Sequence, residues 1–215
     1  MKRGASKIKA LIFDIGGVLC LPKNKKNESV HIFNSFKESL RLSKLVNMKD
    51  KKMIGRIRSI YFKSSTGEIS KEETLKLFSK QVNVKERKIE KIFYDVYKRN
   101  ILINKPLMKL AQNLKKNGYK LGIITDQWHL SKKAVVYEGE YSFFDSIVVS
   151  CDDKAKKPKN KPYFLLLNRL KIKANEALFI DDRMRNIKPA KKLGMKTILF
   201  KNNTQFFTQI KKFNL

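Results

Sequence analysis

Short apolar runs that each end at a polar side chain constrain the fold of this chain more than any other feature. These runs and the polar residues after them are 11–13 with Asp14, 121–124 with Thr125, and 177–180 with Asp181 and Asp182. Runs of this length, separated by segments of helical periodicity, are typical of buried strands in a parallel sheet. Because ligands of an open α/β sheet bind at the carboxyl ends of its strands, we expect these polar residues to lie together.

After residue 100, helical and strand patterns alternate along the chain. Helices are expected at 105–116, 130–137, 162–170 and 184–193, and strands at 120–125, 146–150, 177–180 and 197–200, in addition to a first strand at 8–13. The residues that follow 200 are expected to add a short helix. This alternation predicts an α/β fold with a doubly wound parallel sheet that has helices on both faces.

Residues 22–100 have a different pattern, with dense charge and apolar residues at helical spacing. Ser70 and Glu73 form the spacing of a capping box at the start of one such helix. The apolar stripes comprise Val30, Phe33, Phe36 and Leu40, then Leu75, Leu77 and Phe78, then Ile89, Ile92, Phe93, Val96 and Tyr97. We therefore predict an all-helical domain at 22–100, inserted into a core formed by 1–21 and 101–215.

The net charge of +30 raises the question of nucleic-acid binding, because clustered cations release counterions from a phosphate backbone. The chain has 40 lysines and only 9 arginines, whereas recognition of phosphates and bases favours the arginine fork. The lysines are also spread over every segment. This pattern indicates compositional bias and nonspecific attraction of nucleic acid rather than a dedicated site.

Composition also bounds the class of protein and the compartment. A hydrophobic content of 42% fits a globular chain, and no apolar run reaches the roughly 20 residues that a membrane span needs. The N-terminal pattern is not that of a signal peptide. The chain has two cysteines, Cys20 and Cys151, too few for a disulfide framework. A cytoplasmic protein without membrane contact is expected; the sequence does not indicate an oligomeric state.

The polar residues and their surroundings resemble the four motifs of the haloacid dehalogenase superfamily, most of whose members are Mg²⁺-dependent phosphatases. Residues 14–19 are similar to its first motif, Thr125 and Asp126 to its second, Lys157 to its third, and Asp181 and Asp182 with Asn186 to its fourth. Residues 179–194 are most similar to the phosphatase domain at the N-terminus of mammalian soluble epoxide hydrolase. The resemblance covers nearly the whole chain. It implies a Rossmann-like core, with the helical insertion as a cap over the active site.

The resemblance also implies roles for individual residues. Asp14 would be the nucleophile that forms an aspartyl-phosphate, and Asp14, Asp182 and the carbonyl group of Gly16 would bind Mg²⁺. Asp181 and Asn186 would orient waters of the metal. Thr125 and Lys157 would hold the phosphoryl group of a small phosphorylated substrate, with Asp126 and Trp128 lining its pocket.

Elementary chemistry agrees with these roles but leaves alternatives open. An ionised carboxylate can attack phosphorus, but Asp14 also suits a turn before two glycines. Adjacent carboxylates suit Mg²⁺, but they also cap helices. Lys157 competes for its role with Lys154, Lys156, Lys159 and Lys161; the resemblance favours Lys157, because Pro158 and the spacing to the following helix match the family's third motif. Trp128 could line the substrate pocket, but an aromatic residue next to a strand end is more often a core residue. His129 could move protons, but a lone histidine is usually a surface or capping residue.

Position 16 departs from the family pattern. Most phosphatases of the superfamily have a second aspartate there, which protonates the leaving group and later activates water; this chain has Gly16. Such acid–base groups typically contribute about 10² to 10⁴ in rate. We therefore expect a phosphatase that is weak or selective for good leaving groups. The alternatives are a non-catalytic protein that binds a phosphorylated ligand, a protein or nucleic acid, and a 2-haloacid dehalogenase, whose relatives usually have an aromatic residue at this position and bind no metal.

Overall fold

The computed structural model describes residues 7–23, 51–136 and 138–215. At its centre is a parallel sheet of five strands in the order β5-β4-β1-β6-β7. In chain order the strands are β1 (Ala10–Phe13), β4 (Lys120–Thr125), β5 (Ser146–Val149), β6 (Ala177–Asp181) and β7 (Lys196–Leu199). Because the chain extends the sheet first to one side of β1 and then to the other, β1 marks the switch point where open α/β sheets bind ligands.

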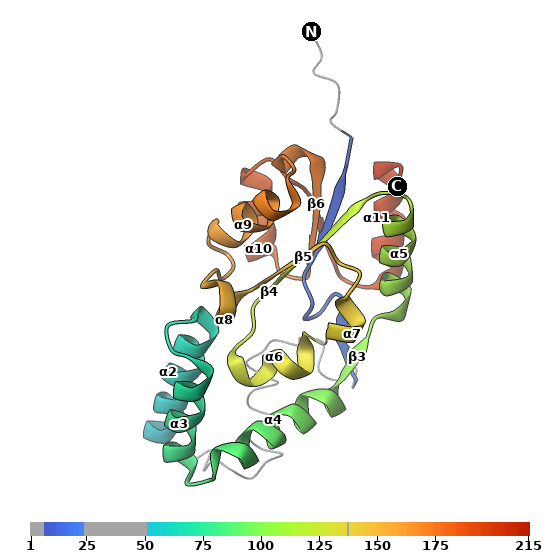
Figure 1. Ribbon diagram of the computed structural model, residues 1–215. Coiled ribbons are helices and arrows are strands. Elements are labelled where there is room, and N and C mark those ends of the chain that lie inside the picture. The colour runs from blue at the N-terminus through green and yellow to red at the C-terminus, as the bar shows by residue number, and fades with distance from the viewer. Residues whose placement is uncertain (1–6, 24–50, 137) are drawn as a thin grey trace.

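Helices cover both faces of this sheet, as predicted (Figure 1). Helices α5 (Lys105–Lys116) and α11 (Asn203–Ile210) lie on one face, and α9 (Lys161–Leu170) and α10 (Met184–Lys192) lie on the other. The shorter elements are α6 (His129–Val135), α7 (Glu138–Tyr141), α8 (Ser150–Asp153), η1 (Ala174–Glu176) and η2 (Lys211–Phe213). The doubly wound α/β fold is therefore confirmed.

The side chains of each strand alternate between the two faces of the sheet, which explains why helices cover both faces. Leu11 and Phe13 of β1 belong to the apolar cluster on the α5 side, whereas Ile12 belongs to the cluster that includes α9 and α10. Since successive side chains of a strand point to opposite faces, each of these buried runs needs helices on both. Gly122 of β4 lets α9 approach closely, because a Cβ at this position would lie 2.7 Å from a side-chain carbon of Leu166.

The described part of the insertion is helical and lies beyond the carboxyl ends of the strands (Figure 1). It contains α2 (Lys51–Thr66), α3 (Lys71–Val82) and α4 (Glu86–Asn100). The predicted capping box of Ser70 and Glu73 is present at the start of α3. The buried residues of α4 are Ile89, Phe93, Val96 and Tyr97 of its predicted stripe, whereas Ile92 is half-buried. The predicted stripe at 30–40 lies outside the described residues.

Two short strands at the ends of the insertion are absent from the predicted elements. β2 (Cys20–Pro22) and β3 (Ile101–Ile103) form an antiparallel pair in which Cys20 lies opposite Ile103. This pair brings the chain segments on either side of the insertion together at the edge of the core. The domain boundaries after residues 21 and 100 stay a prediction.

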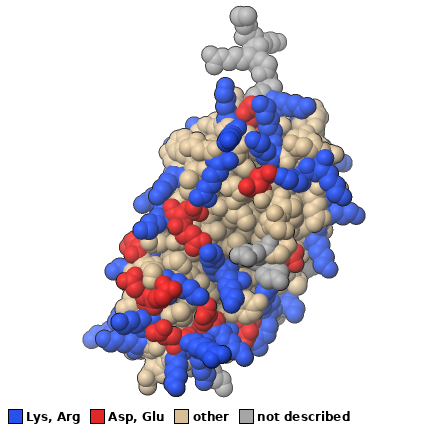
Figure 2. Space-filling model, viewed as in Figure 1, with Lys and Arg blue, Asp and Glu red and all other residues tan. Residues whose placement is uncertain are grey.

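Cationic side chains are spread over the surface rather than gathered in one stripe. Figure 2 shows lysine and arginine around most of the visible face, with aspartate and glutamate among them mainly at its lower left. This distribution agrees with compositional bias, and nonspecific binding of nucleic acid stays a prediction. Among the described helices, none combines the length and the apolar composition that crossing a bilayer requires.

Candidate active site

The register of the parallel strands brings the predicted site residues to one edge of the sheet. Phe13 of β1 is paired with Ile180 of β6, so that Asp14 and Asp181, the next residues, lie side by side. On the other side of β1, Thr125 is the last residue of β4. Carboxylate oxygens of Asp14, Asp181 and Asp182 all lie within 4.8 Å of one another. The expected cluster therefore exists, and it lies at the switch point.

The turn after β1 holds Asp14 and explains the two glycines. The backbone N–H of Ile15 donates a 2.7 Å hydrogen bond to Oδ1 of Asp14. Gly17 has φ +86°, and a Cβ there would lie 2.7 Å from Oδ2 of Asp182. Gly17 is therefore required both by its backbone conformation and by the close approach of Asp182. Gly16 does not have a positive φ, and a Cβ there would have no heavy atom within 4 Å.

Lys157 is the buried cation at the centre of the site. Its Nζ lies 2.9 Å from Oδ2 of Asp14 and 2.7 Å from Oδ2 of Asp181, and it donates a 3.0 Å hydrogen bond to the carbonyl oxygen of Ile124. The other four candidate lysines, Lys154, Lys156, Lys159 and Lys161, are exposed or half-buried. Burial alone would lower the pKa of Lys157, but the carboxylates of Asp14 and Asp181 raise it above its ordinary value. Lys157 therefore stays charged.

Asp181 accepts hydrogen bonds from three residues of the chain. Besides Lys157, the backbone N–H of Arg183 donates to its Oδ1 at 2.8 Å, and Nδ2 of Asn186 lies 3.0 Å from both of its oxygens. Tyr163 in turn donates a 2.9 Å hydrogen bond to the carbonyl oxygen of Asn186. Asp181 thus connects Lys157 to the first turn of α10 through hydrogen bonds.

Asp182 differs from Asp181 because part of its carboxylate lacks a hydrogen-bond partner. Oδ1 of Asp182 and Oδ1 of Asn186 are buried and have no hydrogen-bond partner among the described residues. The nearest cation to Oδ1 of Asp182 is Nε of Arg183, at 3.9 Å. Buried oxygens without partners are costly unless something binds them. Two hard oxygen donors next to Asp14 fit a divalent cation such as Mg²⁺.

Burial makes the acidic cluster unfavourable without additional positive charge. Burial raises the pKa of Asp14 to about 8, because Lys157 only partly offsets the effects of burial and of the neighbouring Asp181 and Asp182. Burial and then Asp181 also raise the pKa of Asp182. When all three carboxyl groups are ionised, the single ammonium group of Lys157 leaves net negative charge in the buried site. A bound divalent cation would neutralise it.

Thr125 is positioned by a network that the sequence analysis missed. Its hydroxyl accepts a 2.9 Å hydrogen bond from Nε2 of Gln127, and Oε1 of Gln127 accepts one from Ser131 at 2.8 Å. Ser150 accepts a hydrogen bond from the backbone N–H of Gln127 and donates one to its carbonyl oxygen. Polar side chains directly after β4 and β5 were the available signal for Gln127 and Ser150.

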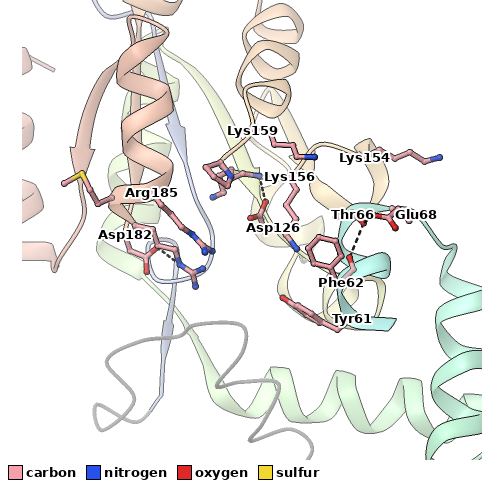
Figure 3. Close-up of a pocket in the computed structure, with 15 residues that line it drawn as sticks. Tyr61, Phe62, Thr66, Glu68, Asp126, Lys154, Lys156, Lys159, Asp182 and Arg185 are labelled. Atoms are coloured by element: carbon pink, nitrogen blue, oxygen red, sulfur yellow. Dashed lines mark hydrogen bonds and ion pairs between the residues drawn. The ribbon is translucent and has the colours of Figure 1, made fainter. Parts of the chain in front are cut away.

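A small cavity adjoins these groups and opens toward a larger cleft. The small cavity, of about 20 Å³, is lined by Asp14, Gly16, Thr125, Asp126, Gln127, Lys157, Arg183 and Asn186. The cleft, of about 1230 Å³, extends to α2 (Figure 3). Asp126, Lys157 and Arg183 line both cavities. Asp126 also accepts a 3.1 Å hydrogen bond from the backbone N–H of Lys157. A small anion bound near Asp14 would therefore face the cleft.

Two of the candidate residues lie away from the carboxylate cluster. Trp128 is fully buried, packs against Tyr61 and Phe93, and donates a 3.1 Å hydrogen bond to Tyr97. It does not line either cavity, because its ring fills the core between α6 and the helical insertion. Nε2 of His129 lies 3.1 Å from the carbonyl oxygen of Ile69, so His129 contacts the insertion and not the carboxylate cluster.

Comparisons with known proteins agree with this geometry. Bifunctional epoxide hydrolase 2 of Mus musculus is 35% identical over 115 residues, which are 51% of this chain and 21% of the mouse protein. Glyceraldehyde 3-phosphate phosphatase of Methanocaldococcus jannaschii is 36% identical over 97 residues, 42% of this chain and 41% of the archaeal protein. The matches thus span about a fifth and two fifths of these two relatives.

A solved structure supports the fold. A HAD family enzyme of Bacteroides thetaiotaomicron, in complex with magnesium and inorganic phosphate, has a TM-score of 0.64 and 19% identity, with 89% of this chain and 93% of that chain covered. The sequence model of the haloacid dehalogenase-like hydrolases matches residues 11–200, from β1 to the end of β7. The predicted resemblance is therefore confirmed: this chain belongs to the haloacid dehalogenase-like hydrolase family.

Proposed function

We propose that this chain is a Mg²⁺-dependent phosphatase that transfers the phosphoryl group of a small phosphorylated metabolite to Asp14 and then to water. The observation that carries the proposal is the cluster of Asp14, Lys157 and Asp182, in which Oδ1 of Asp182 has no hydrogen-bond partner among the described residues. Two names among the related proteins support it, a phosphatase of glyceraldehyde 3-phosphate and an enzyme bound to magnesium and phosphate.

In the proposed reaction, each residue of the site would have a separate role. A carboxylate oxygen of Asp14 forms a bond to phosphorus while the bond from phosphorus to the leaving oxygen breaks, and that oxygen takes a proton from solvent. Water then attacks the phosphorus of the aspartyl-phosphate, which releases inorganic phosphate and restores the carboxylate of Asp14. Lys157 offsets the charge of the phosphoryl group, and the hydroxyl of Thr125 donates to one of its oxygens.

Asp14, Asp182 and the carbonyl group of Gly16 would hold Mg²⁺, and Asp181 and Asn186 would orient its waters. The ion would supply charge stabilisation to the phosphoryl oxygens. The unpartnered oxygens of Asp182 and Asn186 support this assignment for the chain itself. They also favour a phosphatase over a dehalogenase, since the dehalogenases of this superfamily bind no metal at this site.

Magnesium should therefore stabilise the folded protein. A ligand that binds only the native state at 100 times its Kd adds about 2.7 kcal/mol to the free energy of unfolding. We expect millimolar Mg²⁺ to raise the melting temperature at constant ionic strength, and Asp182→Ala to remove most of that rise. Asp95→Ala, on α4 and outside both cavities, is the control and should retain it. An unchanged melting temperature of the wild-type protein would contradict the metal assignment.

Gly16 should make protonation of the leaving group the weak step. We expect the rate of the wild-type protein to fall steeply as the pKa of the leaving group rises, so that alkyl phosphates react much more slowly than aryl phosphates. The backbone tolerates a side chain at Gly16, because φ is not positive and a Cβ there would have no described heavy atom beyond its chain neighbours within 4 Å. The variant should recover about 10- to 100-fold of the rate on alkyl phosphates and little on aryl phosphates.

A leaving-group series measured on both proteins checks this prediction. The affinity for Mg²⁺, determined in parallel, controls for damage to the loop. If the rate depends equally steeply on the pKa of the leaving group in two proteins that both bind the metal, another group already supplies the proton. Asp126 would then be the candidate, because it lines both cavities and burial raises its pKa.

A further inference from the structure

The cleft above the phosphoryl site has an excess of positive charge. It is lined by six cationic side chains, Lys154, Lys156, Lys157, Lys159, Arg183 and Arg185, and by three acidic ones, Glu68, Asp126 and Asp182. Lys157 is already paired with Asp14 and Asp181, and Arg183 lies near Asp182. In the part of the chain that the structure describes, no ion pair joins a carboxylate to Lys156, Lys159 or Arg185.

Lys156 and Arg185 approach the same region from different elements. In Figure 3, Asp182 and Arg185 lie on one side of the cleft and Tyr61 and Phe62 on the other, with Lys156 between them. Nζ of Lys156 lies 5.6 Å from the ring centroid of Tyr61 and 5.1 Å from that of Phe62, and it is hydrogen-bonded to Ser65. The ammonium group is therefore held in place by α2 rather than free in solvent.

The cations also repel one another. Burial lowers the pKa of Lys156 and Asp126 opposes this effect, while the nearby Arg185 and Arg183 lower the pKa further. Like charges held close together in a partly buried cleft are costly unless an anion binds between them. In the proposed reaction the phosphoryl group lies next to Asp14, so a different anionic group would bind at these cations.

We infer that Lys156 and Arg185 form a subsite for a second anionic group of the substrate, a carboxylate or a second phosphate. This inference rests on the proposed phosphatase function, because it extends the substrate outward from the phosphoryl site. Asp126, Lys157 and Arg183 line both cavities, so the cleft lies next to the small cavity at Asp14. The exposed ring of Phe62 provides an apolar wall for the part of the substrate between its two charges.

Matched aryl phosphates test the subsite. The first pair is 3-carboxyphenyl phosphate and 3-carbamoylphenyl phosphate, which have similar shapes but differ in the second charge. The second pair has the same groups one methylene farther from the ring, and 1,3-phenylene bisphosphate tests a second phosphate. Hydrogen bonds to charged groups imply that kcat/KM is about 10- to 100-fold higher for the anionic member at fixed ionic strength. If kcat/KM rises more for a carboxylate than for the bisphosphate, the second anionic group is a carboxylate. The opposite order identifies a second phosphate.

Variants show whether the named residues are responsible. Arg185→Gln, at an exposed position of α10, should reduce the ratio of kcat/KM for the anionic substrate to kcat/KM for the neutral one. The expected ratio is about one third of its wild-type value or less, and Lys156→Gln should also reduce it. Lys188→Gln removes an exposed charge of the same helix outside the cleft and should leave the ratio unchanged. Equal kcat/KM within both pairs and for the bisphosphate, or a ratio that Arg185→Gln and Lys156→Gln leave intact, would overturn the inference.

Binding measurements separate this inference from the proposed function. Calorimetric titration of the Asp14→Asn variant with each pair of compounds measures affinity without turnover. Tighter binding of the anionic member, lost in Arg185→Gln, supports the subsite even if the wild-type protein hydrolyses none of these esters. Hydrolysis of both members at equal rates, with equal affinities, overturns the subsite and leaves the phosphatase function in place.

Discussion

Asp14→Asn should lower turnover of an activated aryl phosphate by roughly 10³- to 10⁶-fold, the range expected when an enzyme loses its nucleophile. The amide has the shape of the carboxylate and can still accept the hydrogen bond from the backbone N–H of Ile15, so the turn after β1 should persist. What the variant lacks is the oxygen nucleophile that forms a bond to phosphorus. Steady-state rates at saturating Mg²⁺ check the prediction.

The control for Asp14→Asn is the same substitution outside the site. Asp95→Asn lies on α4 and should retain full activity. Far-UV circular dichroism and the melting temperature establish that both variants are folded. Turnover by a folded Asp14→Asn variant at more than about a tenth of the wild-type rate would contradict a nucleophilic role.

Lys157→Met should cause the largest loss of stability, because it leaves the carboxylates of Asp14 and Asp181 buried without their cation. Removal of one partner of a buried ion pair typically costs about 3–5 kcal/mol of the free energy of unfolding. In a chain of 215 residues this cost corresponds to a fall of about 6–20 °C in the melting temperature. Scanning calorimetry without Mg²⁺ measures the effect of the ion pair itself.

Lys161→Met is the matched control for Lys157→Met. Lys161 is exposed at the start of α9, where a lysine contributes little to stability, so this variant should melt within about 2 °C of the wild-type protein. Equal melting temperatures for the two variants would mean that the ion pairs of Lys157 do not hold the site together.

The core could be predicted from the sequence because its strands are buried on both faces. Such strands are continuous apolar runs that are easily recognised, and β4 and α5 were predicted with their observed bounds. The pair β2 and β3 was missed, since strands of three residues have no period to detect. The helix α8 has only four residues and was missed for the same reason.

Site residues that directly follow a strand could be predicted from the sequence. Residues whose position depends on tertiary contacts were harder to predict. Asp14, Thr125 and Asp181 were expected to meet because parallel strands end at one edge of a sheet. The choice of Lys157 needed the resemblance to the family, since five lysines lie within eight residues of one another. Trp128 follows β4 as a substrate-contacting residue would, but the aromatic residues of the insertion enclose it, which local sequence does not reveal.

Direct observation of phosphorylated Asp14 tests the central claim most sharply. Gly16 lacks the carboxylate that would activate water, so the aspartyl-phosphate should form rapidly from an acyl or aryl phosphate and break down slowly. Wild-type protein mixed with acetyl phosphate and Mg²⁺, quenched in acid within a turnover and digested, should contain one phosphoryl group on the peptide that includes Asp14. Asp14→Asn should contain none. Release of phosphate by the wild-type protein without a phosphoryl group on Asp14 at any time point would contradict the account.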